Sequence, residues 1–257
     1  MDEIIITVLG SGTSSGVPTI ACKCYICTSN NPKDKRLRSS ILVQSKNTSI
    51  VIDSGPDFRQ QMLANNVDFL DAIIYTHSHY DHIAGFDDLR AFNFINGKPV
   101  QILASEGTMK KLKAVNEYAF SVPEQLGGGI PLINTHIISY EDFIVNDIRI
   151  EPIKLFHGKI EVMGFRIGNF AYCTDTNFIP DESLLKLQNL DCLIIDGLKY
   201  ERHPTHFSIA ESIEIINKLK PKIAYLTHIS HDISHEDCEN ELPPNIRLAY
   251  DGLKIII

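Results

Sequence analysis

The sequence contains no long apolar run and has fewer basic than acidic residues, and each absence excludes a class of protein. No run approaches the roughly 18 apolar residues of a membrane span, so we expect no membrane partner. The segment MDEIIITVLG carries acidic residues where a signal peptide needs basic ones, which predicts a cytoplasmic location. With 24 Lys and Arg against 32 Asp and Glu, the net charge of −8 argues against nucleic-acid binding through a broad basic surface. A small patch of basic residues could still lie within this acidic surface.

The 257 residues also show no internal repeat, low-complexity stretch or linker, so nothing marks a domain boundary. A chain of this length can bury a substantial core. Its 44% apolar and 22% charged residues are typical of a globular protein and argue against disorder or a coiled coil. We therefore expect one domain that spans residues 1–257.

Short β-branched segments that end at Gly, Ser, Asn or Asp predict the strands. They cover residues 3–10, 39–45, 48–55, 71–77, 100–105, 133–139, 148–156, 161–168, 169–175, 190–197, 222–228 and 253–257. Helices are predicted within residues 54–66, with Pro56 at the first helical position, and at 86–97, 106–120, 181–189 and 208–219. Because strands often follow strands directly, the pattern favours mixed sheets covered by helices over a strictly alternating parallel fold.

The first strand leads into GSGTSSGVP, which resembles a dinucleotide-binding loop only at first sight. The glycines fall at positions 10, 12 and 16, which is not the Rossmann spacing, and no strand–helix–strand unit follows. Two interpretations stay open. The glycines could permit a turn into the next segment, or they could allow the backbone to approach a bound phosphate.

The segment IIYTHSHYDHIAG concentrates metal-ligand chemistry. His77 and His79 lie two residues apart at the end of a predicted strand and so project to the same side, and Asp81 and His82 follow. Such a cluster is costly to bury unless something pairs with it, whereas a lone histidine is more often an ordinary core or surface residue. Three later apolar strands also end in a polar residue: His157, Asp175 and His228. We interpret these residues as ligands for two metal ions.

These motifs resemble those of the metallo-β-lactamase superfamily of hydrolases, and the resemblance covers essentially the whole chain. It implies an α+β fold, a four-layer αββα sandwich of two mixed β-sheets flanked by helices, with the site at one edge of the sheets. It further implies two ligand sets: His77, His79 and His157 for one metal, and Asp81, His82 and His228 for the other. Asp175 then corresponds to the bridging carboxylate, and Asp53 to the acidic residue that fixes ligand tautomers.

Two ions about 3.5–4 Å apart can hold a bridging hydroxide and grip the attacking and leaving oxygens, so hydrolysis is the expected reaction. His206 resembles the extra histidine of the phosphodiesterase branch, and a general acid of this kind contributes about 10²–10⁴-fold. His203 is an alternative acid, and a place beside a helix cap is an alternative role for His206. Asp196 could orient His206 or could simply end a strand. The candidate catalytic side chains are Asp81, His206 and Asp196.

Within that branch, the segments GSGTSSGVP, CKCYIC, THSHYDH, HFS and THISH resemble the PhnP-like group, which includes a phosphodiesterase that opens cyclic ribose phosphates. The resemblance implies a small phosphodiester substrate, either a cyclic ribose phosphate or a nucleotide-like diester. Three alternatives stay open: a tRNA 3′-processing endoribonuclease, an acyl or thioester hydrolase, and a metal-binding module without activity. The long arm with which the tRNA-processing enzymes grip tRNA is not evident in the sequence. This absence argues against the tRNA-processing alternative.

Cys22, Cys24 and Cys27 fall within six residues of one another, in TIACKCYICTSN. A disulfide framework is not expected in a cytosolic chain of this size, whereas a structural zinc needs four such ligands. The sequence offers His231, His235 and Cys238 for the fourth position, while Cys173 and Cys192 lie in apolar strands typical of core thiols. The PhnP-like pattern selects His231, three residues beyond His228. One loop would then serve both metal sites.

The basic run KDKRLRSS contains two arginines whose planar guanidinium groups suit phosphate oxygens. Arg36 or Arg38 could therefore contact the substrate, although a solvated loop charge is the commoner role. The catalytic ligands suit zinc, manganese or iron, and the sequence does not choose among them. A homodimer is also left open.

Overall fold

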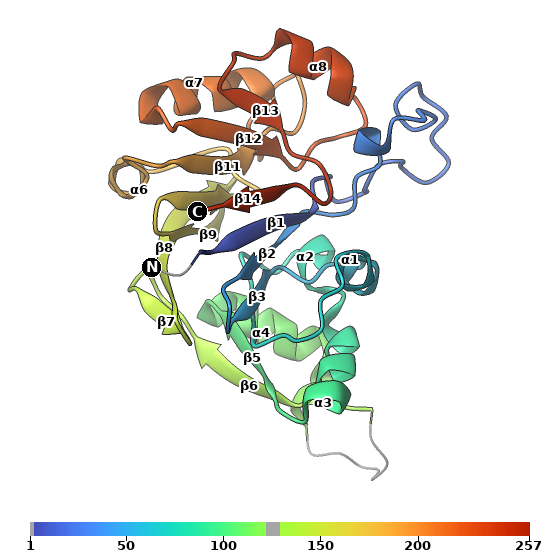
Figure 1. Cartoon of the computed structure of the whole chain (residues 1–257), viewed down its shortest axis with the longest axis vertical. Helices are drawn as coiled ribbons and strands as arrows, with labels where there is room; N and C mark the ends of the chain where they lie inside the picture. Colours follow the sequence, from blue (N-terminus) through green and yellow to red (C-terminus); the bar gives the residue numbers. More distant parts are fainter. Residues whose placement is uncertain (1–2, 122–128) are drawn as a thin grey trace.

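The computed structural model describes residues 3–121 and 129–257 and places two seven-stranded sheets face to face, with helices outside them (Figure 1). The first sheet has the order β14-β1-β2-β3-β4-β5-β6. Its strands are β1 (Ile5–Gly10), β2 (Ser40–Gln44), β3 (Ser49–Ile52), β4 (Ala72–Ile74), β5 (Val100–Ala104), β6 (Ile133–Ile137) and β14 (Lys254–Ile256). The chain therefore returns near its end to the sheet in which it began.

The second sheet has the order β13-β12-β11-β10-β9-β8-β7. Its strands are β7 (Phe143–Val145), β8 (Ile148–His157), β9 (Ile160–Ile167), β10 (Phe170–Cys173), β11 (Cys192–Asp196), β12 (Ile223–Thr227) and β13 (Ile246–Leu248). Both sheets are mixed, because β3 to β6 pair in parallel, as do β10 to β13, while hairpin partners such as β8 and β9 are antiparallel.

Helices cover the outer face of each sheet. Those of the first half are α1 (Phe58–Ala64), α2 (Tyr80–Ile83), η2 (Phe86–Leu89), α3 (Arg90–Asn96), α4 (Glu106–Val115) and α5 (Glu117–Phe120). Those of the second half are α6 (Asp181–Lys186), α7 (Ile209–Leu219) and α8 (His235–Glu241), and the short η1 (Pro32–Asp34) lies in the loop before β2. The predicted four-layer αββα sandwich is confirmed. No helix in the described residues is both long and apolar enough to cross a bilayer.

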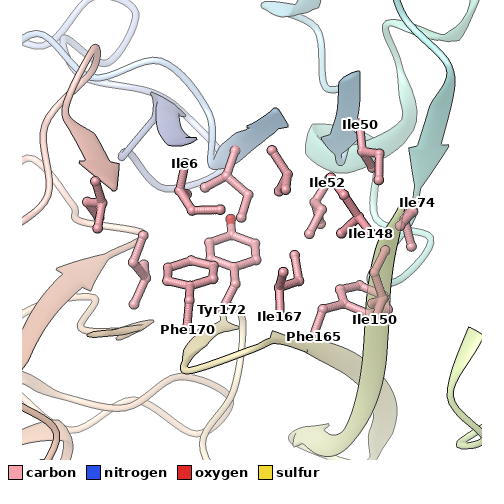
Figure 2. Close-up of a cluster of buried hydrophobic side chains, with 14 of the residues drawn as sticks. Ile6, Ile50, Ile52, Ile74, Ile148, Ile150, Phe165, Ile167, Phe170 and Tyr172 are labelled. Atoms are coloured by element: carbon pink, nitrogen blue, oxygen red, sulfur yellow. The ribbon is translucent and has the colours of Figure 1, made fainter. Parts of the chain in front are cut away.

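Alternating side chains of both sheets form the central core, and Figure 2 shows residues from the two sheets pointing toward one another. Ile6, Ile50 and Phe165 are each fully buried there. Two further apolar clusters lie under the helices, one around Phe58 of α1 and one around Ile216 of α7. Because the central cluster takes side chains from both sheets, burial of its apolar area stabilises the sandwich as a unit.

The order of the strands brings several strand ends to one edge of the sandwich. β3 and β4 run parallel in the first sheet, and β10, β11 and β12 run parallel in the second. The carboxyl ends of parallel strands meet at the same edge, which is where ligand sites form in sheets of this kind. Most of the predicted metal ligands follow the ends of these strands.

Several elements differ from the sequence-based expectations. Pro56 precedes α1 rather than occupying its first position, because the helix begins at Phe58 after Asp57. The predicted helix at 106–120 is interrupted at Asn116, which caps α4 and begins α5. The strands β7 and β13 were not predicted.

A candidate dinuclear metal centre and a cysteine–histidine cluster

Seven predicted ligands meet at this edge in two groups that share Asp175. Within each group, the potential ligand atoms all lie within 4.8 Å of one another. The first group contains His77, His79, His157 and Asp175, and the second contains Asp81, His82, Asp175 and His228. The arrangement coincides with the two expected ligand sets, including the shared carboxylate.

Backbone strain accompanies three of the residues at the strand ends. Asp53 follows β3, Asp175 lies just beyond β10, and His228 follows β12, and their φ angles are 67°, 52° and 60°. Non-glycine residues adopt this left-handed conformation at a cost of about 1–3 kcal/mol, which surrounding structure must offset. The fold therefore holds these side chains in fixed directions at the site.

Hydrogen bonds fix which nitrogen of each imidazole can bind a metal. His82 Nδ1 lies 2.7 Å from Asp53 Oδ2, and His157 Nδ1 lies 2.7 Å from the carbonyl oxygen of Thr205. Both partners accept hydrogen bonds, so each Nδ1 carries the proton and each Nε2 keeps its lone pair. His77 Nδ1 is similarly 2.9 Å from Thr76 Oγ1, whose own proton goes to Asp53. Such outer partners orient metal ligands.

Three imidazole nitrogens of the site are buried and have no hydrogen-bond partner within residues 3–121 and 129–257. This holds for Nε2 of His77, Nε2 of His82 and Nδ1 of His228. His228 Nδ1 lies only 2.9 Å from Asp175 Oδ1, yet the two atoms are not aligned as a hydrogen bond. Buried polar groups are normally satisfied. Nitrogen and oxygen lone pairs directed at a common point are satisfied by a cation, so the residues present fit a pair of divalent ions.

Two of the ligand histidines are held in the neutral form that binds metals, whereas the carboxylates around His82 favour its charged form. Burial lowers the pKa of His157 to about 4 and lowers that of His77 well below its ordinary value, so both are neutral ligands near pH 7. Burial alone would raise the pKa of Asp175, but His228 and His82 hold it well below its usual range. The pKa of His82 is raised in turn by Asp175 and Asp53, against the effect of burial. Such opposed shifts are typical of functional sites.

His206 and Asp196 lie against the second ligand group. The His206 ring is stacked on His228 with centroids 4.6 Å apart, and it is 4.5 Å from the His157 ring. Its Nδ1 is 2.7 Å from Asp196 Oδ2, so Asp196 is placed to orient it. Burial raises the pKa of Asp196 and lowers that of His206. Ser208, rather than His206, caps α7.

The three predicted thiols surround one imidazole nitrogen. Sγ of Cys22, Cys24 and Cys27 lie 3.4, 3.5 and 3.6 Å from His231 Nδ1. Zinc with bonds of about 2.3 Å to sulfur and 2.0 Å to nitrogen would separate these atoms by about 3.5 Å in a tetrahedron. The backbone N–H of Cys27 and the side chain of His231 lower the pKa of Cys24 to about 6, which favours the thiolate that metals bind. The donor set fits a structural zinc.

The other candidates for the fourth position lie elsewhere. His235 is buried and contacts Tyr250 with ring centroids 5.9 Å apart, and Cys238 is buried in the core under α8. Cys173 and Cys192 are core thiols of β10 and β11. Neither His235 nor Cys238 belongs to the cluster of ligand atoms around His231. The selection of His231 thus agrees with the geometry.

Neither role that the sequence left open for Arg36, a contact with substrate or a solvated loop charge, agrees with its buried position. The Arg36 side chain is fully buried, pairs with Asp34 at 3.2 Å, and donates to the carbonyl oxygens of Ser230 and Ile233. These carbonyls flank His231, so Arg36 braces the loop that carries His228 and His231. The basic residues around Arg36 gave no sign of this role, because no sequence pattern marks a guanidinium nine residues after Cys27 as buried.

Arg38 contacts the glycine-rich segment of residues 10–16. Arg38 pairs with Asp57 at 2.9 Å and donates to the carbonyl oxygen of Ser14. A Cβ at Gly10 would lie 2.0 Å from the carbonyl oxygen of Arg38, so this glycine permits close approach of the chain to itself. A Cβ at Gly55 would lie 1.9 Å from the carbonyl oxygen of Asp81. Sequence reasoning missed Gly55, Thr76 and Thr205, which contribute backbone or ordinary polar groups.

Comparison with known proteins agrees with this geometry. A family model described as a beta-lactamase superfamily domain matches residues 48–229. A solved structure described as a new diphosphatase from the PhnP family is 42% identical, with a TM-score of 0.93, and the match covers 99% of this chain and 97% of that one.

Two curated proteins are also similar. An octanoyltransferase of Porphyromonas gingivalis is 36% identical over 97% of this chain and 51% of its own length. A ribonuclease Z of Clostridioides difficile is 26% identical over 68% of this chain and 59% of its own length. The chain therefore spans about half the length of the curated relatives it matches.

Proposed function

This chain belongs to the metallo-β-lactamase superfamily of hydrolases, and from that premise we propose that it hydrolyses small phosphodiesters or diphosphates with two divalent metal ions. The observation that carries the proposal is the His206–Asp196 pair beside the ligand groups, at 2.7 Å. Acyl hydrolysis at a dinuclear site needs no such proton donor. The departure of an alkoxide from phosphorus benefits from one.

The ligand residues have separate tasks in this proposal. His77, His79 and His157 would hold one ion, Asp81, His82 and His228 the other, and Asp175 both. Bound there, the ions would activate water at neutral pH and neutralise charge on the phosphate. Asp53 and the Thr205 carbonyl keep two imidazoles in the tautomer that presents Nε2. Zinc or manganese would suit this donor set.

His206 would give its proton to the leaving oxygen. Because Asp196 Oδ2 faces Nδ1, the opposite nitrogen Nε2 is the atom that can present a proton to substrate. Asp196 also accepts a hydrogen bond from the Thr176 backbone, which fixes the carboxylate and therefore the imidazole plane. Stacking of the His206 ring on His228 keeps it beside the second ligand group. Asp196 is thus a positioning residue for the acid.

Two alternatives rest on the relatives. The ribonuclease Z likeness favours an endoribonuclease, whereas the net charge of −8 argues against a large RNA substrate. The octanoyltransferase likeness favours acyl chemistry, but about half of that protein lies outside the match. A PhnP-family diphosphatase that covers nearly the whole chain supports a small phosphate substrate more directly.

The test varies the leaving group. The metal-loaded wild type and His206→Ala are assayed on a p-nitrophenyl and an alkyl ester of the same nucleotide, beside a thioester and a precursor tRNA. A general acid matters most for the poor leaving group, so His206→Ala should lose about 10²–10⁴-fold on the alkyl ester and far less on the aryl ester.

Equal losses on both esters would contradict the role of His206. Hydrolysis of only the thioester or the tRNA would instead support one of the alternatives. Asp175→Ala serves as the control, because removal of the shared carboxylate should abolish every hydrolytic activity of this site. An unaffected Asp175→Ala variant would point to a module without metal-dependent catalysis.

A further inference from the structure

The segment of residues 198–206 forms a rim beside the candidate metal centre, and several of its hydrogen bonds reach residues next to the site. The Leu198 N–H donates to the carbonyl oxygen of Phe207, and the Ser230 N–H donates to the carbonyl oxygen of Leu198. His157 Nδ1 donates to the carbonyl oxygen of Thr205. The segment is thus tied at both ends to residues next to His206, His157 and the His228 loop, and side chains of the segment are held near the reacting group.

His203 presents a hydrogen-bond donor from this rim. Its ring centroid lies 5.3 Å from that of His206, and the side chain is only partly buried. The Thr205 backbone N–H lies 3.4 Å from His203 Nδ1, and Thr205 Oγ1 lies 3.2 Å from the same atom. Since a backbone amide can only donate, Nδ1 is the acceptor, and the neutral ring carries its proton on Nε2. That N–H is free for a ligand.

Lys199 adds a positive charge to the same rim. It is half-buried, and it makes no ion pair with any acidic residue of the described segments, whereas its neighbour Arg202 pairs with Glu211 at 3.2 Å. Its backbone is fixed, because the Ile209 N–H donates to the Lys199 carbonyl oxygen. The backbone of this segment also lies beside that of His206, since the Leu198 N–H, next to Lys199, donates to the carbonyl oxygen of Phe207. A lysine held near a metal site without an acidic partner is suited to an anion.

We propose that Lys199 and His203 form a subsite for a second phosphate, the one that departs when the scissile bond breaks. The inference rests on the proposed function and deepens it, because it names organic diphosphates as the preferred substrate class. The subsite adjoins His206, which faces the leaving oxygen, while the seven metal ligands surround the phosphorus under attack.

The chemistry of a diphosphate explains why cations are needed at this position. Water oxygen bonds to one phosphorus, the bridging P–O bond breaks, and its electron pair stays on the second phosphate. The protons of the water are lost to solvent, directly or through His206. The departing phosphate gains negative charge in a chain of net charge −8, so fixed donors that face the developing charge lower the barrier. An alcohol or phenol leaving group carries no second phosphate and would use the subsite far less.

The test compares Lys199→Gln, Lys199→Arg and His203→Gln with the metal-loaded wild type on two substrates, diadenosine diphosphate and bis(p-nitrophenyl) phosphate. We expect Lys199→Gln and His203→Gln to lose at least tenfold more kcat/KM on the diphosphate than on the aryl diester. Lys199→Arg should recover part of the loss. Lys218→Gln is the matched control, because Lys218 is exposed on α7, pairs with Asp181, and should leave both rates unchanged.

Parallel losses on both substrates would overturn the proposal, as would a diphosphate rate that Lys199→Gln leaves intact. A second readout does not depend on turnover. Methylene diphosphate, whose P–C–P bridge resists hydrolysis, should bind the metal-loaded wild type more tightly than Lys199→Gln in calorimetry. If the wild type hydrolyses neither substrate but this difference in affinity persists, the proposed function fails and the anion subsite stands. Equal affinities would overturn the subsite whatever the rates.

Discussion

His235 shows how an individual residue can couple stability to pH. It is almost fully buried, both of its ring nitrogens lack hydrogen-bond partners, and burial with the charges of Lys33 and Arg36 lowers its pKa to about 4. Asp34 opposes this shift without reversing it, and Glu239 lies 4.0 Å from Nε2. The unfolded chain therefore binds a proton at His235 below about pH 6.5, whereas the folded chain does so only below about pH 4.

The expected outcome is a loss of folding stability as the pH falls from 6.5 toward 4, because the unfolded state takes up the proton first. At pH 5 this one group should cost about 2 kcal/mol relative to pH 7.5. His235→Phe keeps an aromatic ring against Tyr250 and removes the titration, so its stability relative to wild type should rise by that amount as the pH falls. Urea unfolding at both pH values measures it. His136→Phe, at an exposed position on β6, should show no such gain.

Residue-level prediction succeeded where a side chain itself carries the chemistry. The metal ligands are histidines and carboxylates at the ends of apolar strands, so type and position together indicated them. The Thr205 carbonyl, which orients His157, could not be found in this way because every residue has a carbonyl oxygen. Arg36 was misjudged because a charged residue in a loop is usually solvated, and only tertiary contacts with Ser230 and Ile233 show its burial.

At the scale of elements, the loop after β12 is held by two independent braces. The cysteine cluster holds it through His231, and the Asp34–Arg36 pair holds it through carbonyl oxygens on either side of His231. His228 begins the same loop in a left-handed conformation and reaches the catalytic ligand group. We therefore expect the two candidate metal sites to be mechanically coupled, with the cysteine cluster as one of two connections.

Cys24→Ser should lose the structural zinc and weaken the catalytic site only in part, because Arg36 still braces the loop. Arg36→Met removes the other brace and leaves Asp34 buried without its partner, which typically costs about 3–5 kcal/mol. We expect the double variant to lose more catalytic metal than the two single changes together. Metal content by mass spectrometry and activity on an aryl diester measure the effect. Unchanged catalytic metal in all three variants would show that the loop needs neither brace.

Element prediction depended on length. The long β-branched strands and the amphipathic α7 were evident, since several turns or alternations repeat the pattern. The helix α8 was missed because its sequence HEDCENE offers a single apolar position, and α2 was missed because its four residues are the metal-ligand motif itself. In α2, metal-ligand residues stand where the apolar residues of a helix pattern would be expected.

For the whole molecule, the path of the chain opposes separate folding of the two sheets. β14 pairs with β1, so the first sheet is complete only after the second has been added between them in the sequence. The central core also takes side chains from both sheets. These two features favour a single domain on physical grounds. The sequence pattern alone could not show them, because pairing between the two ends of a chain leaves no local pattern.

We therefore expect one cooperative unfolding transition, and we expect chelation to lower its midpoint. A ligand that binds only the folded state stabilises it by RT ln(1 + [L]/Kd), or about 4 kcal/mol at a thousandfold excess over Kd. Without ions, the carboxylates of Asp81 and Asp175 would stay close together in the buried site and repel each other, and the folded state would bear that electrostatic cost. Calorimetry of the metal-loaded protein with and without a chelator measures the shift. Asp175→Asn, which weakens both ligand groups, should reduce the shift, and two resolved transitions in the metal-loaded protein would contradict the single domain.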